Sequence, residues 1–227
     1  IVVIPWRPAP SRVPAFERVV AWYHEHLPEL QVVTVDTDDT PFVLAACRNK
    51  AMRKAPDAAV VIINDADTLP EVGALRAAIA AAAESPLVHL PYTEYRWLGA
   101  EGSAQVAAGV PFEDCAHDVV AGACSGVYVA TPQTWTSHGG QDEGFRGWGF
   151  EDAAWRLAHI TLLGAEPVRH DGRVYALHHL AEIRAGAGYE ANAERMQRYR
   201  DADGDREAMA ELVGLVAGVT LDEADAA

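Results

Sequence analysis

Short apolar runs alternate with helical patterns along the first half of the chain. The runs are rich in Val and Ile, are bounded by turn-forming residues, and are typical of buried strands. They lie at 1–5, 31–36, 58–63 and 86–92. Between them, apolar residues recur at helical spacing in 14–27, in 41–55 and, from Pro70, in 70–83. This alternation predicts an α/β fold with an open, largely parallel sheet flanked by helices.

The second half of the chain is less regular. Alternating residues predict strands at 125–131 and 173–179, a short helix ends at a Gly pair near 139–140, and a longer helix begins near Glu151. Residues 99–124 mix Gly, Ala and acidic residues and suggest a loop or insertion. We expect one domain over 1–180, followed by a helical C-terminal extension at 181–227 that ends in a frayed acidic tail.

Two carboxylates follow the third predicted strand, at Asp65 and Asp67. Alternate residues of an extended chain point to the same side, so these side chains converge and would repel by about 3 kcal/mol at roughly 6 Å and an effective dielectric of 20. A bound cation would offset this repulsion, whereas the alternative is a turn with an Asx cap before Pro70. Parallel sheets bind ligands at the carboxyl ends of their strands, where residues 5–12 and Asp36 would join the two aspartates.

Two adjacent histidines, His178 and His179, end the last predicted strand. Neighbouring residues of a strand point to opposite faces, so at most one of them is expected to join the aspartates. A set of carboxylate oxygens with one imidazole nitrogen suits Mn²⁺ or a similar divalent ion. The alternative for a single histidine is a structural role.

The segment GWGFED, at 147–152, is the other candidate for chemistry. Its glycines permit a tight, mobile backbone, and Trp148 offers a flat face on which a sugar can stack. Glu151 and Asp152 stand at a predicted helix N-terminus, where a fixed carboxylate can act as a general base. The alternative is a capped helix entered through a Gly-rich loop, with Trp148 filling the core.

Composition and charge restrict the class of ligand. The chain has 227 residues with a formal charge of −15, from 33 acidic and 18 basic residues, so we expect no nucleic-acid partner. A phosphate-bearing ligand would need a cation or a local Arg cluster, which makes a metal more useful. No apolar stretch reaches the roughly 20 residues of a membrane-spanning helix, so no membrane insertion is expected. Cys47, Cys115 and Cys124 lack a CxxC spacing, which argues against a disulfide framework and favours a cytoplasmic setting.

The segments INDADTLP, SGVYVAT, GFRGWGFEDAAWRL and RVYALHH together resemble a known family. They are similar to metal-dependent glycosyltransferases of the GT-A (nucleotide-diphospho-sugar transferase) fold, of the galactosyltransferase C-terminal type. The β-1,4-galactosyltransferases and polypeptide N-acetylgalactosaminyltransferases are better-known relatives. The likeness covers most of 1–180 and implies a single, mostly parallel, twisted sheet flanked by helices. It also implies a nucleotide-binding half at about 1–95 and an acceptor half at about 120–180.

The resemblance implies a donor site that holds a nucleotide sugar, most plausibly a UDP-sugar. Asp67 and one of His178 and His179 would be ligands of Mn²⁺ (or Mg²⁺), with Asp65 contacting the donor or its metal. The cation would stabilise the departing diphosphate as a Lewis acid. The residues implied to bind the donor are Pro5, Arg7, Arg12, Asp36, Arg48, Asn49 and Asp65.

The resemblance also implies an acceptor site and a mechanism. Asp152 matches the catalytic base, which would deprotonate a hydroxyl of a glycan or protein acceptor in a single inverting displacement. Glu151, Trp148 and Gly149 would bind the acceptor. The sequence departs from the galactosyltransferases at Phe150, where they have glycine, and at Ala153, where they carry another acid. The donor sugar and the acceptor are therefore not transferred from those relatives.

Three other functions compete with this hypothesis. A catalytically inactive nucleotide- or glycan-binding domain would keep the site without turnover. A haloacid-dehalogenase-type phosphatase normally has Thr or Val where Leu69 stands and needs a downstream Lys, yet the only lysines are Lys50 and Lys54. A sugar-nucleotide pyrophosphorylase would have a Gly-rich, Lys-containing segment after the first strand, which is absent here.

Overall fold

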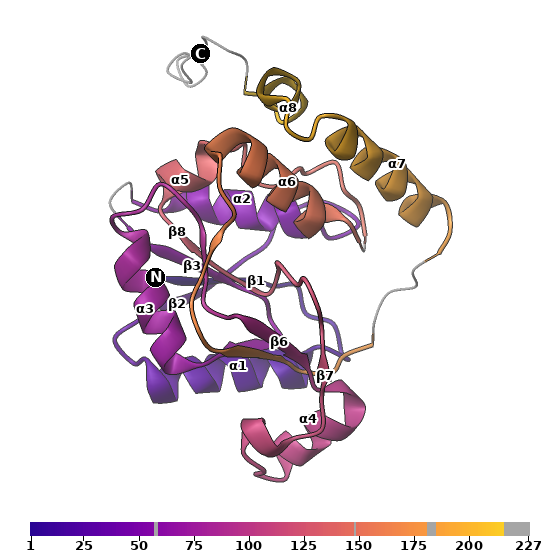
Figure 1. The fold of residues 1–227 in the computed structure, drawn as a ribbon. Coiled ribbons are helices and arrows are strands. Elements are labelled where there is room, and N and C mark those ends of the chain that lie inside the picture. Colours follow the sequence, from indigo (N-terminus) through magenta and orange to yellow (C-terminus); the bar gives the residue numbers. More distant parts are fainter. Residues whose placement is uncertain (57–58, 148, 181–184, 216–227) are drawn as a thin grey trace.

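A central sheet lies between two layers of helices in the computed structural model, which describes residues 1–56, 59–147, 149–180 and 185–215. One layer contains α2 (Leu44–Lys54), α5 (Pro132–Thr136) and α6 (Glu151–Leu163). The opposite layer contains α1 (Val13–His26) and α3 (Val72–Ala82). Figure 1 shows these layers above and below the strands. None of the helices in the described ranges is long and apolar enough to cross a membrane.

The larger sheet has six strands in the order β2-β1-β3-β8-β5-β9. Its strands are β1 (Val2–Pro5), β2 (Val32–Val35), β3 (Val61–Asn64), β5 (His89–Leu90), β8 (Val127–Ala130) and β9 (Val168–Arg169). β1 is parallel to both β2 and β3, whereas β8 is antiparallel to β3 and β5. The carboxyl ends of β1, β2 and β3 therefore meet at one edge of the sheet.

A second sheet has four strands in the order β4-β10-β6-β7. They are β4 (Thr68–Pro70), β6 (Glu94–Trp97), β7 (Asp118–Val119) and β10 (Arg173–Ala176). In this sheet Thr68 is paired with Ala176. The chain just after Asp67 thus lies beside the chain that leads to His178 and His179. The strands divide into two sheets where the sequence suggested one, because β4 turns away from β3 to pair with β10.

Two segments differ from the sequence expectation. Pro70 ends β4 rather than opening a helix, and α3 begins at Val72 after Glu71 in extended conformation. The segment expected to be a loop or insertion contains α4 (Gly99–Ala107) and a 3-10 turn at Phe112–Asp114. Alanines at several positions of α4 supply helix propensity that its glycines reduce without cancelling.

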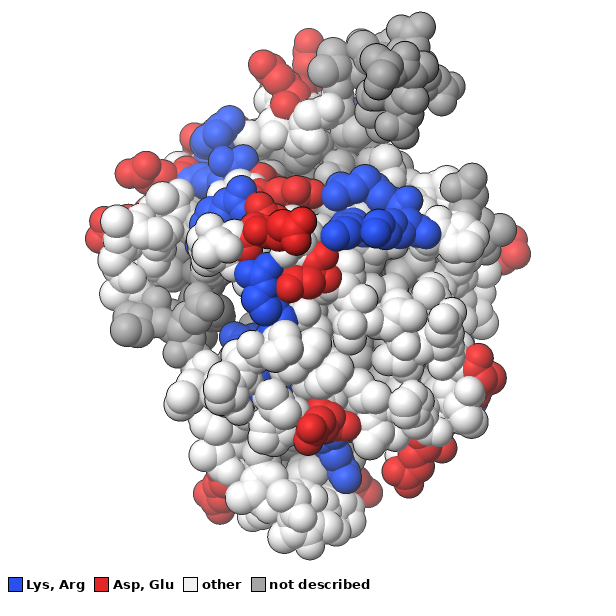
Figure 2. Space-filling view, turned by 180° about the vertical axis from the view of Figure 1, so that it is seen from behind, with Lys and Arg blue, Asp and Glu red and all other residues white. Residues whose placement is uncertain are grey.

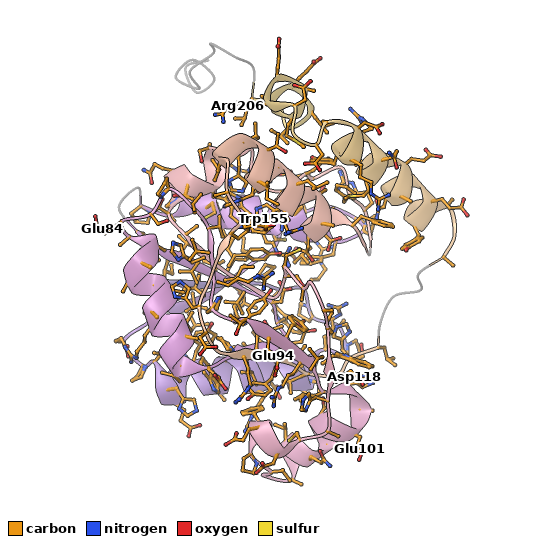
Figure 3. The ribbon with its side chains drawn as sticks, viewed as in Figure 1. Glu84, Glu94, Glu101, Asp118, Trp155 and Arg206 are labelled. Carbon is orange, nitrogen blue, oxygen red and sulfur yellow. The ribbon has the colours of Figure 1, made fainter. Side chains whose placement is uncertain are left out.

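The C-terminal helices α7 (Ala187–Asp201) and α8 (Arg206–Leu212) pack on the outer side of α6. Their Met196, Tyr199 and Met209 form an apolar cluster with Phe145 and with Leu162 of α6. On its inner side α6 directs Trp155 toward the main core (Figure 3). The expected extension therefore contributes two packed helices, and the acidic tail at 216–227 lies outside the described residues.

Candidate active site

A buried arginine joins the two carboxylate segments singled out in the sequence. Arg48 of α2 has no exposed surface, and its Nη2 donates to both carboxylate oxygens of Asp65, at 2.7 and 2.9 Å. Its Nη1 donates to Oδ1 of Asp152 at 2.8 Å. One guanidinium thus links the end of β3 to the first turn of α6, and the fork-shaped contact with Asp65 fixes the relative orientation of the two groups.

Asp152 is held in place by three side chains. Its Oδ1 accepts from Arg48, from the hydroxyl of Tyr128 and, at 3.4 Å, from Nε2 of Gln141. Within the described part of the chain, Oδ2 of Asp152 accepts no hydrogen bond, and a quarter of the side chain is exposed. One oxygen is therefore fixed while the other is available to a proton donor.

Tyr128 and Gln141 were not singled out from the sequence. Tyr128 lies in β8, and burial raises the pKa of its hydroxyl well above the ordinary value, so the neutral phenol donates to Asp152. A tyrosine in an otherwise apolar buried strand could have indicated this contact, since a buried phenol hydroxyl usually has a hydrogen-bond partner. Gln141 follows the Gly pair in a loop and carries no comparable signal.

Two carboxyl groups near Arg48, those of Asp65 and Glu151, have raised pKa values. Burial raises the pKa of Asp65 to about 6, with added repulsion from Asp67 and Asp152, although Arg48 opposes the shift. Burial, together with the charge of Asp152, raises the pKa of Glu151 to about 7. Three carboxyl groups are thus gathered around one buried cation, and addition of a further positive charge would relieve their repulsion.

Asp67 and His179 form the candidate metal centre. Oδ2 of Asp67 lies 2.9 Å from Nε2 of His179, and the hydrogen bond to Asp67 raises the pKa of the imidazole. His178 points elsewhere: its amide donates to Ser103, and its ring faces Trp97. The two adjacent histidines therefore diverge, as alternation along an extended chain requires.

The donor atoms of this pair fit a divalent cation. A carboxylate oxygen and an imidazole nitrogen suit Mn²⁺ as ligands, and the side chains that carry them are each about one fifth exposed. Both oxygens of Asp65 are already bonded to Arg48, and no group of three or more candidate ligands was found among the described residues. Asp67 and His179 would therefore need further ligands, which the described residues do not supply.

Arg7 and Asp36 lie together where β1 and β2 end. Nε and Nη2 of Arg7 each donate to one oxygen of Asp36 at 2.8 Å, and Nη1 donates to the carbonyl of Asp39. Pro5, the last residue of β1, is paired with Val35. Arg12 precedes α1. These residues gather at the expected edge of the sheet.

Asn49 is used entirely inside the fold. Its Nδ2 donates to Gln141 and Glu143, and its Oδ1 accepts from the Trp135 ring and the Gln141 amide. All four hydrogen-bonding positions of the amide are occupied. In this structure the amide therefore fixes the loop that carries Gln141.

The Gly-rich loop before α6 is held by α7. Gly149 has φ +109°, and Phe150 adopts φ +74°, a left-handed conformation that glycine adopts more readily. Asn192 of α7 accepts from the amide of Arg146 at 3.1 Å and donates to the Arg146 carbonyl at 2.9 Å. Trp148 lies outside the described residues. The departure noted at Phe150 thus occupies a backbone conformation that glycine would also adopt.

Solved structures of other proteins resemble this fold, although sequence comparisons find no match. No family model matches the sequence, and no curated protein matches it. The catalytic domain of Drosophila β1,4-galactosyltransferase 7, solved with xylobiose, superposes with a TM-score of 0.56 at 15% identity, over 85% of this chain and 78% of that one. GalNAc-T7, solved with UDP, GalNAc and Mn²⁺, gives a TM-score of 0.59 at 13% identity, over 93% of this chain. The chain has a GT-A glycosyltransferase fold.

The GT-A fold expected from the sequence motifs is thereby confirmed. This chain matches only 53% of the length of the GalNAc-T7 structure. The identities are low, so the comparison concerns the GT-A architecture and not the individual site residues. Those residues are supported by the geometry of this chain alone.

Proposed function

We propose that the protein is a metal-dependent, inverting glycosyltransferase that moves a sugar from a UDP-sugar to a hydroxyl of a glycan or protein acceptor. The observation that carries the proposal is the state of Asp152. Arg48, Tyr128 and Gln141 fix its Oδ1, and its Oδ2 accepts no hydrogen bond from a described residue. A fixed carboxylate with one available oxygen is what a general base requires.

The donor side is supported by cations at the edge of the sheet. Arg7 is oriented by Asp36 and by backbone carbonyls at the ends of β1 and β2, where a nucleotide can contact it. The buried Arg48 forms ion pairs with both Asp65 and Asp152. Asp67 and His179 would hold Mn²⁺, which would stabilise the negative charge on the leaving diphosphate.

The acceptor side is supported by the position of Asp152 beside Glu151 at the start of α6. In this role Asp152 takes the proton of the acceptor hydroxyl through Oδ2 while Tyr128 and Arg48 keep the carboxylate from rotating. Glu151, whose pKa is about 7, can hydrogen-bond the acceptor in either protonation state. One base on one face of the reacting carbon favours inversion.

The test is Mn²⁺-dependent binding and UDP release across a panel of UDP-sugars, measured by calorimetry and by a coupled nucleotide assay. We expect one donor to bind only with Mn²⁺ and Asp67→Ala to weaken that binding at least about tenfold, the low end for a residue that supports a metal. Asp152→Asn should keep donor binding and lower turnover by about 10²- to 10⁴-fold. Asp201→Ala, which changes an exposed aspartate of α7, is the matched control.

The outcomes separate the proposal from its rivals. Metal-dependent binding without any turnover would indicate an inactive nucleotide-binding domain. No metal-dependent binding to any UDP-sugar would contradict the donor site and leave Asp65 and Asp67 as part of a structural turn.

A further inference from the structure

A cleft of about 620 Å³ is lined in part by Arg156 of α6, the helix that also carries the candidate base. It lies between the second sheet, β9 and α6, and its lining includes Tyr92, Tyr95, Val120, Arg156, Glu166 and Arg169. Its volume is within the range of small-ligand sites. Glu94 of β6, labelled in Figure 3, also lines it.

The cleft shares a wall with the candidate active site. Tyr95 contacts Gly126, where an added Cβ would lie 3.1 Å from its ring, and the carbonyl of Gly126 accepts the amide of Asp65. Arg156 follows Asp152 by one turn of α6, so the two side chains leave the same side of the helix. One wall of the cleft therefore belongs to the side of α6 that carries Asp152.

Some of the charged side chains that line the cleft form ion pairs, whereas Arg169 does not. Glu166 is paired with Arg156, and Glu94 is paired with Arg96, with Arg173 also within 3.8 Å. Arg169 has no carboxylate within ion-pair distance in the ranges that the structure describes. Its Nη2 donates to the carbonyl of Ala123 at 2.6 Å, and its guanidinium lies over the ring of Tyr92 at 5.4 Å.

These contacts orient Arg169 without neutralising it. Tyr92 is itself fixed, since its hydroxyl donates to the carbonyl of Ser125 at 2.7 Å. The Nε and Nη1 groups of Arg169 make no hydrogen bond to any described residue. A planar guanidinium with free donors, mounted on an aromatic ring, matches a carboxylate in shape and charge.

We infer that this cleft binds an acidic glycan acceptor and that Arg169 recognises its carboxylate. The inference rests on the proposed transferase function and names the acceptor class for it. The acidic sugar lies over Tyr95 and Val120 with its carboxylate on Arg169, and the reacting hydroxyl reaches the neighbouring Asp152. In a protein with a net charge of −15, an unneutralised arginine is needed to attract such an acceptor.

The test compares two glycosides that differ only in the carboxylate, p-nitrophenyl β-D-glucuronide and p-nitrophenyl β-D-glucoside. Binding of each is measured by calorimetry with and without UDP and Mn²⁺. We expect the glucuronide to bind roughly tenfold more tightly, as one charge-assisted contact provides. Arg169→Gln should abolish this preference, and Arg169→Lys should restore part of it.

Control experiments distinguish failure of this inference from failure of the proposed transferase function. Arg76→Gln removes the same charge from the exposed surface of α3 and should leave the preference unchanged. Thermal unfolding checks that the Arg169 variants are folded, and UDP binding reports on the donor site independently. Equal binding of the two glycosides, binding of neither, or a preference that survives Arg169→Gln would overturn the inference. If the unaltered protein does not bind UDP in the presence of Mn²⁺, this would instead count against the proposed transferase function.

Discussion

Arg48 is the residue on which the candidate site depends most. It has no exposed surface, yet its charge is shared between Asp65 and Asp152. Its Nε makes no hydrogen bond to a described residue, so the whole of its pairing falls on the two terminal nitrogens. Removal of the cation would leave two partly buried carboxylates facing each other.

We predict that Arg48→Gln lowers the free energy of unfolding by about 3 to 5 kcal/mol, the usual cost of breaking a buried ion pair. Arg76→Gln should cost no more than about 1 kcal/mol, because Arg76 and Glu29 are 54% and 48% exposed and the pair is screened by water. Urea unfolding of both variants at neutral pH measures the difference. Similar losses in the two variants would contradict the role given to Arg48.

Glu151 should make stability depend on pH. Its pKa is raised from 4.5 to about 7, so the folded state favours the protonated form. The stability that this provides is complete below pH 4.5 and is lost as the pH rises through 7. Glu151→Gln removes the titration, so the stability of this variant relative to the unaltered protein should increase by about 3 kcal/mol between pH 4.5 and 7.5. Urea unfolding at several pH values tests this, and parallel profiles would contradict it.

At the scale of elements, strands buried on both faces were predictable and strands made by distant pairing were not. The expected strands at 1–5, 58–63 and 125–131 are observed as β1, β3 and β8, because their apolar runs are bounded by turn residues. β6 has the sequence EYRW, which carries no apolar run, and it forms by pairing with β10. The turn of the chain into β4 likewise depends on β10, so Pro70 was misjudged.

The same distinction applies to the site. Local spacing was enough to single out Asp65, Asp67 and Asp152 as candidates. The bridge from Arg48 to Asp152 spans 104 positions of the sequence, so local spacing could not predict it. The internal partners of Asn49, Gln141 and Trp135, could not be read from the sequence either, because they lie 92 and 86 positions away.

Helix α7 should control the order of the Gly-rich loop. Asn192 makes two hydrogen bonds to the backbone of Arg146, so Asn192→Ala should destabilise the loop by about 1 to 3 kcal/mol. Hydrogen exchange of the Arg146 amide should accelerate correspondingly. Gln197→Ala, on the same helix, removes only an exposed contact with Asp201 and serves as the control. Unchanged exchange in Asn192→Ala would show that the loop is ordered by other contacts.

At the scale of the whole molecule, charge is distributed unevenly. Figure 2 shows acidic and basic side chains intermixed over the upper part of one face, while the lower part of that face is mostly uncharged. The net charge of −15 opposes an anionic donor or acceptor at long range. Local cations such as Arg7 and Arg169 must therefore act within a few ångströms, where salt screens them less.

The attachment of the Gly-rich loop to α7 has a consequence for synthesis. The chain emerges from the ribosome in order, so Arg48, Asp65 and Asp152 are all made before Asn192. A nascent chain that ends at His179 already contains the candidate base and the candidate metal pair. Its Gly-rich loop, however, cannot yet make hydrogen bonds to α7. Until α7 has been made and packs on α6, the loop lacks the two hydrogen bonds that Asn192 makes to the backbone of Arg146.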